Sequence, residues 1–440
     1  MNNSICKEMI IFMIFNFLFT SIQAQDSTLN ITLQQAVELS IRNSKNLSIS
    51  KAKIEEANAS LMEAKNGQLP DFKISGSYLR LNSANINLKS SSDSGNSGTG
   101  IKVNQALYGT ATLSMPLFAG GRIKYGIESA RLLKEASMLD AEQDKDAVIF
   151  NCTKAFVNLY KSYEAVLVVK ENLQSSLSRD TNFANLEKNG LLARNDLLKS
   201  QLQTSNIELS LMDAETNNKI AMVNMNLMLG LPENTILNPD SSFINIKPAI
   251  KTFTEYEDLA LQKRGDVKAI GFRKKAAATA IQSAKAEIYP SIGLTGGYVA
   301  AYVPDVITIT NAINIGLGVQ YNLANLYKKN SSLMKSKARQ TQLVASEAVL
   351  QDAIRFQVNQ DYQQFLLSEK KILVFEKAVE QAKENYRITK NKYDNSLLTL
   401  TELLEADVAL LQAKLNSSYG KAEAVLAYNK LLETSGTISN

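Results

Sequence analysis

The sequence contains no histidine and no tryptophan among its 440 residues. Histidine is the side chain that most often serves as a general base near neutral pH, and it is the commonest metal ligand. The chain also has no glycine-rich phosphate-binding loop and no residue spacing typical of a metal site, and Cys152 has no evident base to activate it. We therefore expect a protein that is not an enzyme and that holds no cofactor and no metal.

Cysteine is nearly absent, since the chain has only Cys6 and Cys152. Directly after Cys6, a lysine and an apolar run over residues 9–19 are followed by "SIQAQ", which predicts a secretory signal peptide over residues 1–24. An N-terminal membrane anchor is the alternative, although the run is short for a helix that crosses a bilayer. Cleavage after Ala24 leaves Cys152 alone, so an intrachain disulfide is excluded in the exported protein.

Long apolar runs and dense charge clusters are also missing from the rest of the chain. No later segment is typical of a transmembrane helix, so any part of the protein within a membrane must consist of strands. The formal net charge of +5 is spread thinly along the chain, and we expect no nucleic-acid partner.

The sequence contains an internal repeat. "NGLLARNDLLKSQLQTSNIEL" begins at Asn189 and "NSLLTLTELLEADVALLQAKL" begins at Asn395, an offset of 206 (395 minus 189). Pro70 and Pro290 each follow a helix-like segment and lie 220 residues apart (290 minus 70). The difference of 14 (220 minus 206) predicts an insertion of that length in the Ser/Gly/Asn-rich segment 82–100. A duplicated chain follows, with a first repeat over residues 25–245 and a second over residues 246–440.

Both repeats have the same order of predicted elements. Helical spacing of apolar residues indicates the helices, and alternation indicates the strands, as where Ile313, Ile315 and Leu317 alternate with polar residues or glycine. The predicted elements of the first and second repeats are a helix (32–66; 254–288), two strands (72–81 and 110–118; 292–302 and 313–321), a long helix (122–188; 328–394) and a returning helix (195–229; 401–432). Turns at "NG" (189–190) and "NS" (395–396) join each long helix to its returning helix.

The returning helices carry apolar residues at the spacing of a coiled-coil seam. The predicted seam positions are Leu198, Leu202, Ser205 and Leu209 in the first repeat, and Leu404, Val408, Leu411 and Leu415 in the second. Two shorter helices stacked end to end match one long helix, so each repeat is predicted to form an antiparallel rod.

Four strands of about nine to eleven residues are long enough to cross an outer membrane when they are tilted. Four strands cannot close a barrel, and open sheet edges are not tolerated in lipid. We therefore predict an α+β membrane protein with four transmembrane β-strands per chain and long antiparallel coiled-coil-like helices, in which several chains close the barrel. Three chains would give a 12-stranded β-barrel and a periplasmic α-helical barrel.

Several short motifs in this order carry a family resemblance: "MPLFAGGR" (115–122), "RGDV" (264–267) and the paired tips "NGLLARNDL" and "NSLLTLTELLEA". Together with the helix–Pro–strand junctions, they resemble the TolC-type outer membrane efflux proteins over essentially the whole mature chain. The resemblance implies a homotrimer in outer membrane lipid that exports substrates together with a periplasmic adaptor protein and an inner-membrane transporter. A periplasmic coiled-coil scaffold or adhesin is the alternative, but it leaves the two strand hairpins unexplained.

The sequence departs from the family pattern at a few positions. Asn322 and Tyr327 replace Pro116 and Gly121 in the second strand-to-helix junction, which is expected to bend less sharply. Gly265 stands in "RGDV" where the family usually has proline, and we treat the Arg-Gly-Asp triplet as unrelated to cell adhesion.

The resemblance also implies functional residues at the tips of the rods. Glu402 and Glu405 match acidic positions that line the periplasmic constriction; the alternative is an ordinary solvated face. Asp196 and Tyr393 match residues that hold the closed tip, although the basic partner is replaced by Leu398; the alternative is a pair of surface residues with no gating role. Six residues form the predicted adaptor-docking tips, with internal packing of the turns as the alternative: Gly190, Leu191, Leu192, Ser396, Leu397 and Leu398.

Overall fold

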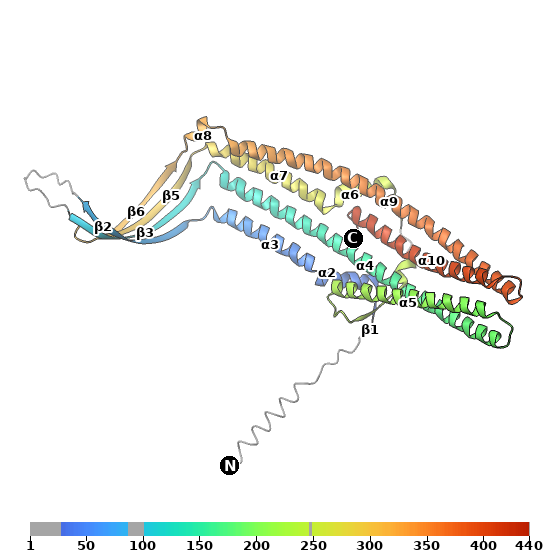
Figure 1. The fold of residues 1–440 in the computed structure, drawn as a ribbon. Coiled ribbons are helices and arrows are strands. Elements are labelled where there is room, and N and C mark those ends of the chain that lie inside the picture. The colour runs from blue at the N-terminus through green and yellow to red at the C-terminus, as the bar shows by residue number, and fades with distance from the viewer. Residues whose placement is uncertain (1–27, 87–100, 246–248, 440) are drawn as a thin grey trace, which may run out of the picture. The chain divides into compact units, whose positions relative to one another are not determined.

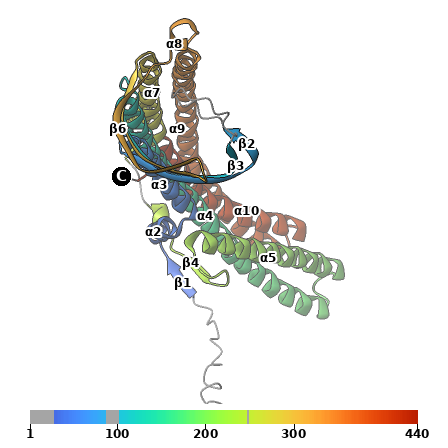
Figure 2. The ribbon, with the colours of Figure 1, turned by 90° about the vertical axis from the view of Figure 1, so that its left-hand side faces the viewer.

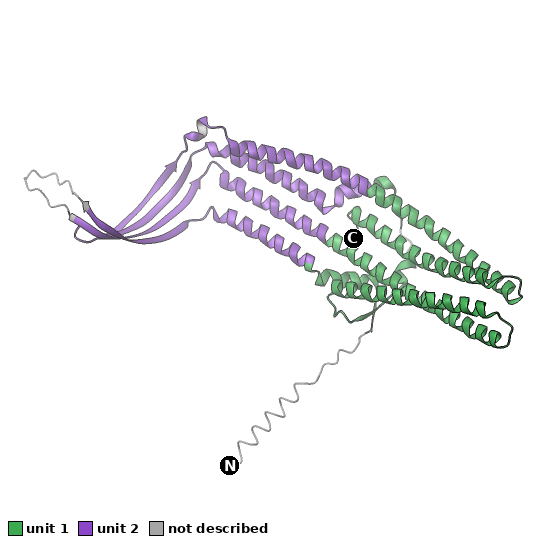
Figure 3. Ribbon diagram, viewed as in Figure 1, with its two compact units in different colours: residues 1–45, 145–255, 358–440 green, residues 46–144, 256–357 purple. Residues whose placement is uncertain are grey.

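The computed structural model describes residues 28–86, 101–245 and 249–439. The predicted signal peptide and most of the predicted insertion, residues 87–100, lie outside these ranges. The chain divides into two compact units, which Figure 3 shows in green and purple. Unit 1 contains residues 1–45, 145–255 and 358–440, and unit 2 contains residues 46–144 and 256–357. Each unit therefore draws on both halves of the sequence.

Unit 2 contains a four-stranded sheet in the order β2-β3-β5-β6, with every neighbouring pair antiparallel (Figure 1). The strands are β2 (Asp71–Ile86), β3 (Ile101–Phe118), β5 (Ser291–Val303) and β6 (Ile307–Gln320). All four lie where the sequence predicts them, and each is longer than predicted because alternation fades toward the hairpin ends. The β3–β5 pairing joins the hairpins of the two repeats into one sheet and leaves β2 and β6 at its edges.

The predicted alternation in β6 is confirmed. Ile313, Ile315 and Leu317 leave 78%, 79% and 69% of their surface exposed, all on one face of the strand. The prolines also hold their predicted places, since Pro70 directly precedes β2 and Pro290 directly precedes β5. A residue before proline disfavours helical backbone, which separates each helix from the strand that follows.

The prediction of one continuous first helix in each repeat is wrong. The first repeat has α2 (Leu33–Asn43) and α3 (Lys45–Asn66), and the second has α6 (Phe253–Lys263) and α7 (Gly265–Lys285), which the 3-10 helix η2 (Ala286–Ile288) extends. The backbone is extended at Ser44 (ψ 118°) and at Arg264 (ψ 134°), and the two breaks are 220 residues apart (264 minus 44), the offset of the prolines. One extended residue barely disturbs the apolar spacing of a helix, so periodicity alone does not reveal it.

Ion pairing and close packing explain the break at Arg264. Its guanidinium, 9% exposed, donates from Nε and Nη2 to both carboxylate oxygens of Asp266, at 3.0 and 2.7 Å. Gly265 between them lies against the backbone of the long helix near Leu139. The Arg-Gly-Asp triplet is thus part of a packed helix junction.

The long helices agree closely with prediction. The first, α4 (Arg122–Lys188), has the predicted bounds, and α9 (Ser331–Asp394) begins three residues later than predicted (331 minus 328). Helix α9 begins later because the short helix α8 (Ala324–Tyr327) occupies the second strand-to-helix junction. The corresponding junction of the first repeat contains Gly120 and Gly121, which both take positive φ. The second junction therefore differs by an added helical turn. The returning helices are α5 (Arg194–Leu229) and α10 (Leu400–Thr434).

The predicted seam is wrong on α5, where Leu198, Leu202 and Leu209 are exposed. On α10 it is partly confirmed, because Leu404, Leu411 and Leu415 are half-buried and only Val408 is exposed. The stripe that the structure buries is Leu197, Ser200, Thr204 and Ile207 on α5, and Leu400, Leu403, Ala406, Asp407 and Ala413 on α10. Small and polar side chains form much of this buried stripe, whereas on α5 the coiled-coil pattern selected the more apolar stripe on the opposite face.

Unit 1 contains a small parallel sheet that the sequence analysis missed. Strand β1 (Thr28–Ile31) pairs with β4 (Ile236–Pro239), and both are labelled near α2 in Figure 2. Four residues are too few to show alternation. Ile31 and Leu237 of these strands join a core in which Phe243 of the 3-10 helix η1 (Ser242–Asn245) packs edge-to-face with Phe156 and Tyr160. The ring centroids are 5.4 Å apart in the Phe156 pair and 5.2 Å apart in the Tyr160 pair.

Candidate functional site

The candidate site lies at the two turns that join α4 to α5 and α9 to α10. Gly190 and Ser396 occupy equivalent positions after the long helices and take left-handed backbone, with φ of 71° and 58°. The N–H of Leu191 donates to the carbonyl of Leu186 at 2.8 Å, and the N–H of Leu397 donates to the carbonyl of Lys392 at 2.9 Å. These bonds are the mark of a Schellman motif, which ends both long helices in the same way. The turns lie where "NG" and "NS" predict them.

The leucine pairs at the turns divide into an exposed and a half-buried member. Leu191 and Leu397 leave 74% and 72% of their surface exposed, while Leu192 and Leu398 are half-buried. Leu192 packs partly on a small core that we call the tip core: Phe183, Leu197, Leu400 and Leu403. Internal packing of the turn therefore accounts for Leu192. It does not account for Leu191 and Leu397, which are exposed, so adaptor docking stays a prediction for those two residues.

Tyr393 and Asp196 come close together at the edge of the tip core. The ring of Tyr393 lies 5.8 Å from that of Phe183, between centroids. Burial raises the pKa of the Tyr393 phenol, and the negative charge of Asp196 raises it further. The described residues include no hydrogen bond between the two side chains, and Asp196 instead pairs with Lys199 at 3.7 Å. The structure thus brings the predicted gate residues together without a direct bond.

An open groove of about 1080 Å³ runs along the tips in unit 1. Its lining includes Leu191, Asp196, Tyr393 and Ser396, so both turns contribute to it. The tips of the two repeats therefore form one surface within a single chain.

Glu402 and Glu405 are both exposed near the start of α10. The Glu402 carboxylate accepts from the backbone N–H and the hydroxyl of Thr399, each at 2.8 Å, and the Thr399 hydroxyl accepts from the N–H of Glu402. This is a capping box, and the backbone bond from Thr399, followed by its hydroxyl bond, lowers the pKa of Glu402. The spacing T-x-x-E in the sequence predicts this role, which our sequence analysis missed. The first tip lacks it, because Ala193 begins α5 without a side-chain cap.

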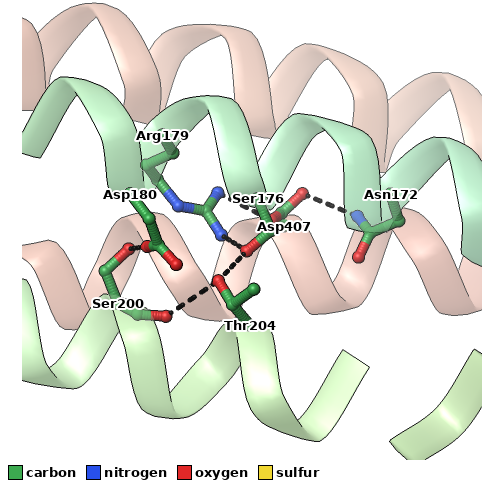
Figure 4. Close-up of polar contacts among 7 residues, drawn as sticks. All are labelled: Asn172, Ser176, Arg179, Asp180, Ser200, Thr204 and Asp407. Carbon is green, nitrogen blue, oxygen red and sulfur yellow. Dashed lines mark hydrogen bonds and ion pairs between the residues drawn. The ribbon is translucent and has the colours of Figure 1, made fainter. Parts of the chain in front are cut away.

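A buried polar network behind the tip core was also missed (Figure 4). Arg179 of α4 and Asp407 of α10 form an ion pair of 2.9 Å between Nη1 and Oδ2. Tyr386 of α9 is beside the pair, and burial first, then the charge of Asp407, raises its pKa. The only sequence sign is a charged residue on the inward stripe of each helix, which is visible only once the helix phase is known.

No helix within the described residues is both long and apolar enough to cross a membrane. Those residues also contain no cluster of side chains able to hold a metal ion.

Comparison with known proteins identifies a family for this chain and solved structures with a similar fold. The family model for outer membrane efflux proteins matches residues 36–231 and 257–437. No curated protein sequence matches the chain significantly. Among solved structures, the CmeC outer membrane channel of Campylobacter jejuni is 17% identical, with 92% of this chain and 86% of that chain covered and a TM-score of 0.78.

Two further structures share the fold. The outer membrane protein VceC of Vibrio cholerae is 17% identical over 92% of this chain and 96% of that chain, with a TM-score of 0.73. The MtrE outer membrane channel of Neisseria gonorrhoeae, described in its open state, is 17% identical over 92% of this chain and 89% of that chain, with a TM-score of 0.69. The family match covers most of the chain, so this chain belongs to the outer membrane efflux protein family and is a protein of the outer membrane with a periplasmic helical extension.

Proposed function

We propose that three copies of this chain form a channel that exports substrates from the periplasm or cytoplasm to the exterior. The observation that carries this proposal is the four-stranded sheet with β2 and β6 at its edges. In lipid, each unpaired backbone N–H or C=O costs several kcal/mol, roughly. Twelve strands from three copies would pair both edges of every sheet.

Two exposed apolar surfaces support assembly. The outer face of β6 presents Ile313, Ile315 and Leu317, which suit contact with lipid. On α5, Leu198, Leu202 and Leu209 form an exposed stripe on the face opposite the buried one, which suits packing against a second copy. A helix that buries one face in its own chain and leaves an apolar stripe exposed on the other fits a tube built from several chains.

Native mass in mild detergent and conductance in planar bilayers test the proposal together. We expect a trimer that inserts and conducts. A stable, membrane-inserted monomer would contradict the assembly. A trimer that never conducts would favour a scaffold or adhesin instead.

We infer that the exposed leucines at the tips, Leu191 and Leu397, dock a periplasmic adaptor that links the channel to an inner-membrane transporter. Leucines exposed on a turn cost free energy in water unless a partner covers them. Replacing both by Asp is expected to abolish crosslinking to the adaptor and export, with trimers still present in the membrane. Replacing both by Met, which keeps the apolar volume, is the matched control and is expected to retain both. Unchanged crosslinking and export in the Asp variant would remove the docking role.

We also propose that Glu402 and Glu405 form an acidic ring at the periplasmic entrance, and that Asp196 and Tyr393 belong to the gate. Three copies would bring six carboxylates around one passage, which favours cations. Thr399 supports this role by lowering the pKa of Glu402, because the carboxylate then keeps its charge to a lower pH than an ordinary glutamate.

A further inference from the structure

The apolar stripe on the outer face of β6 continues beyond the end of the strand. Exposed apolar side chains occupy every second position of the strand up to Val319. Tyr321 and Leu323 continue the same alternation after the last strand residue, Gln320, and Leu323 is 63% exposed. Helix α8 follows at once, where the sheet meets the helices of unit 2 (Figure 1), and its last residue, Tyr327, is 77% exposed. Leu323 and Tyr327 are four residues apart, so they lie on one face of this short helix.

Basic residues follow the apolar stripe directly. Lys328 and Lys329 come straight after α8, and both are exposed. The sequence from 306 to 346 contains no Asp or Glu and five basic residues: Lys328, Lys329, Lys335, Lys337 and Arg339. The chain therefore presents aliphatic side chains on β6, then tyrosines, then lysines. A bilayer has the same order from its centre outward: hydrocarbon, the interface where tyrosine is enriched, and the charged headgroups.

Hydrogen bonds at both ends hold α8 in this position. The side chain of Asn322 accepts from the N–H of Ala324 at 3.1 Å, which fixes the start of the helix. Beyond the helix, the amide of Asn330 donates to a carbonyl of α7 at 3.2 Å, and the hydroxyl of Ser332 donates to the carboxylate of Glu287 at 2.9 Å. The exposed side chains between these contacts are thus held in place before any ligand binds, which lowers the entropic cost of binding.

The first repeat has no such segment. Strand β3 ends at Phe118 and α4 begins at Arg122, so only Ala119, Gly120 and Gly121 join them. Three small residues provide neither an apolar helix face nor a pair of lysines. The surface is therefore a feature of the second repeat alone, with one copy in each chain.

We propose that Tyr321, Leu323, Tyr327, Lys328 and Lys329 form an interfacial anchor that binds the anionic headgroups of glycerophospholipids in the periplasmic leaflet of the outer membrane. The anchor is continuous with the lipid-facing stripe of β6, and it lies at the end of the sheet from which the periplasmic helices extend. The tyrosines and the leucine enter the interface, and the two lysines pair with headgroup phosphates. This role concerns contact with the membrane and is independent of whether the protein conducts.

Competition between two lipids tests the headgroup contact. The purified protein is reconstituted into vesicles of phosphatidylcholine and phosphatidylglycerol in equal amounts and extracted in mild detergent, and the lipids that stay bound are identified by native mass spectrometry. The double variant Lys328→Gln, Lys329→Gln is expected to lower the preference for phosphatidylglycerol roughly fivefold for each lysine, hence about 25-fold for the pair. Both side chains are exposed, so the variant is expected to fold like the parent.

Lys370→Gln, Lys371→Gln is the matched control. These two lysines are also adjacent and exposed on α9, 42 residues further along the chain (370 minus 328), in unit 1 and not in the unit that contains the sheet. The control loses the same charge and is expected to keep the parent's preference. Salt at about 1 M, where the screening length falls to about 3 Å, is expected to remove that preference. No preference in the parent, or an equal loss in both double variants, would overturn headgroup binding.

Fluorescence tests whether the anchor reaches the lipid. The chain has no tryptophan, so Tyr327→Trp introduces a single emitter and keeps an aromatic ring at the position. In vesicles of phosphatidylcholine brominated on the acyl chains near the headgroup, we expect this emitter to lose most of its emission. Phe356→Trp, at an exposed position on α9, is the control and is expected to stay unquenched. Unquenched emission from position 327 would mean that water or a neighbouring copy meets this face, and the anchor would be refuted.

Discussion

Replacing Gly265 by alanine is expected to destabilise unit 2, because the start of α7 lies directly against the backbone of α4. A Cβ at Gly265 would overlap the carbonyl oxygen of Leu139 and lie 3.2 Å from the backbone nitrogen of Gln143. These are backbone atoms of a long helix, so no side chain can rotate to make room. Overpacking of this kind costs typically about 1–3 kcal/mol.

Gly271 provides a control within the same helix. A Cβ at Gly271 would meet nothing within 4 Å, and the residue lies in the interior of α7. Replacing it by alanine restricts the unfolded chain and is expected to stabilise the protein by about 0.5–1 kcal/mol. The same chemical change thus has opposite expected signs six residues apart (271 minus 265).

The assay is the loss of helical circular dichroism when detergent-purified protein is heated at one fixed scan rate. For a unit of this size, 1 kcal/mol shifts the midpoint by about 2–4 °C. We expect Gly265→Ala to lower the midpoint by about 2–12 °C and Gly271→Ala to raise it by about 1–4 °C. Equal shifts in both variants, or no loss at Gly265, would show that α7 can move away from α4 and that close approach does not require glycine there.

Other expectations concern the sheet, the second turn and the entrance. Ile315→Asp is expected to impair trimer assembly, because charge on the lipid face costs about 2–4 kcal/mol at mid-membrane, while Asn314→Asp on the opposite face assembles normally; equal native masses would mean that the strand faces are reversed. Ser396→Gly is expected to stabilise the protein by about 1 kcal/mol, because glycine carries no penalty in left-handed backbone, and an unchanged thermal midpoint would contradict this. The Glu402→Ala, Glu405→Ala double variant is expected to lose cation selectivity and block by multivalent cations, and the parent's selectivity is expected to persist below the usual pH range of glutamate. A reversal potential equal to the parent's in a salt gradient would make these two carboxylates ordinary surface residues.

The elements that the sequence predicts well are those with a long and regular signal. Helix α4 has its predicted bounds because 67 residues without proline keep helical spacing throughout, and the prolines at 70 and 290 mark where the strands begin. The constant offset between the repeats fixed the two turns as a pair. The helix break at Arg264 was not predicted because a single extended residue barely alters the helical spacing of apolar residues. Strand β1 was not predicted because it is short and pairs with a strand more than 200 residues away.

The candidate site shows a second limit of sequence analysis. Apolar spacing on α5 predicted the stripe through Leu198 and Leu202, yet the chain buries the stripe through Ser200 and Thr204. A helix with one apolar face and one face of small and polar residues gives no local sign of which face its own chain buries. Periodicity also cannot show that Arg179 and Asp407, 228 residues apart, form a buried ion pair.

The two tips differ in chemistry while keeping one backbone path. Both turns use the same Schellman bonds, but glycine takes the left-handed position in the first and serine in the second. The helix after the first turn has Ala193 at its N-cap, which provides no side-chain cap, whereas Thr399 and Glu402 cap the helix after the second. Asp407 then ties that second helix to the first rod. The cap, the acidic pair and the buried aspartate thus all lie on α10, so the shared backbone path leaves the two returning helices free to differ in the charges that they present near the tip.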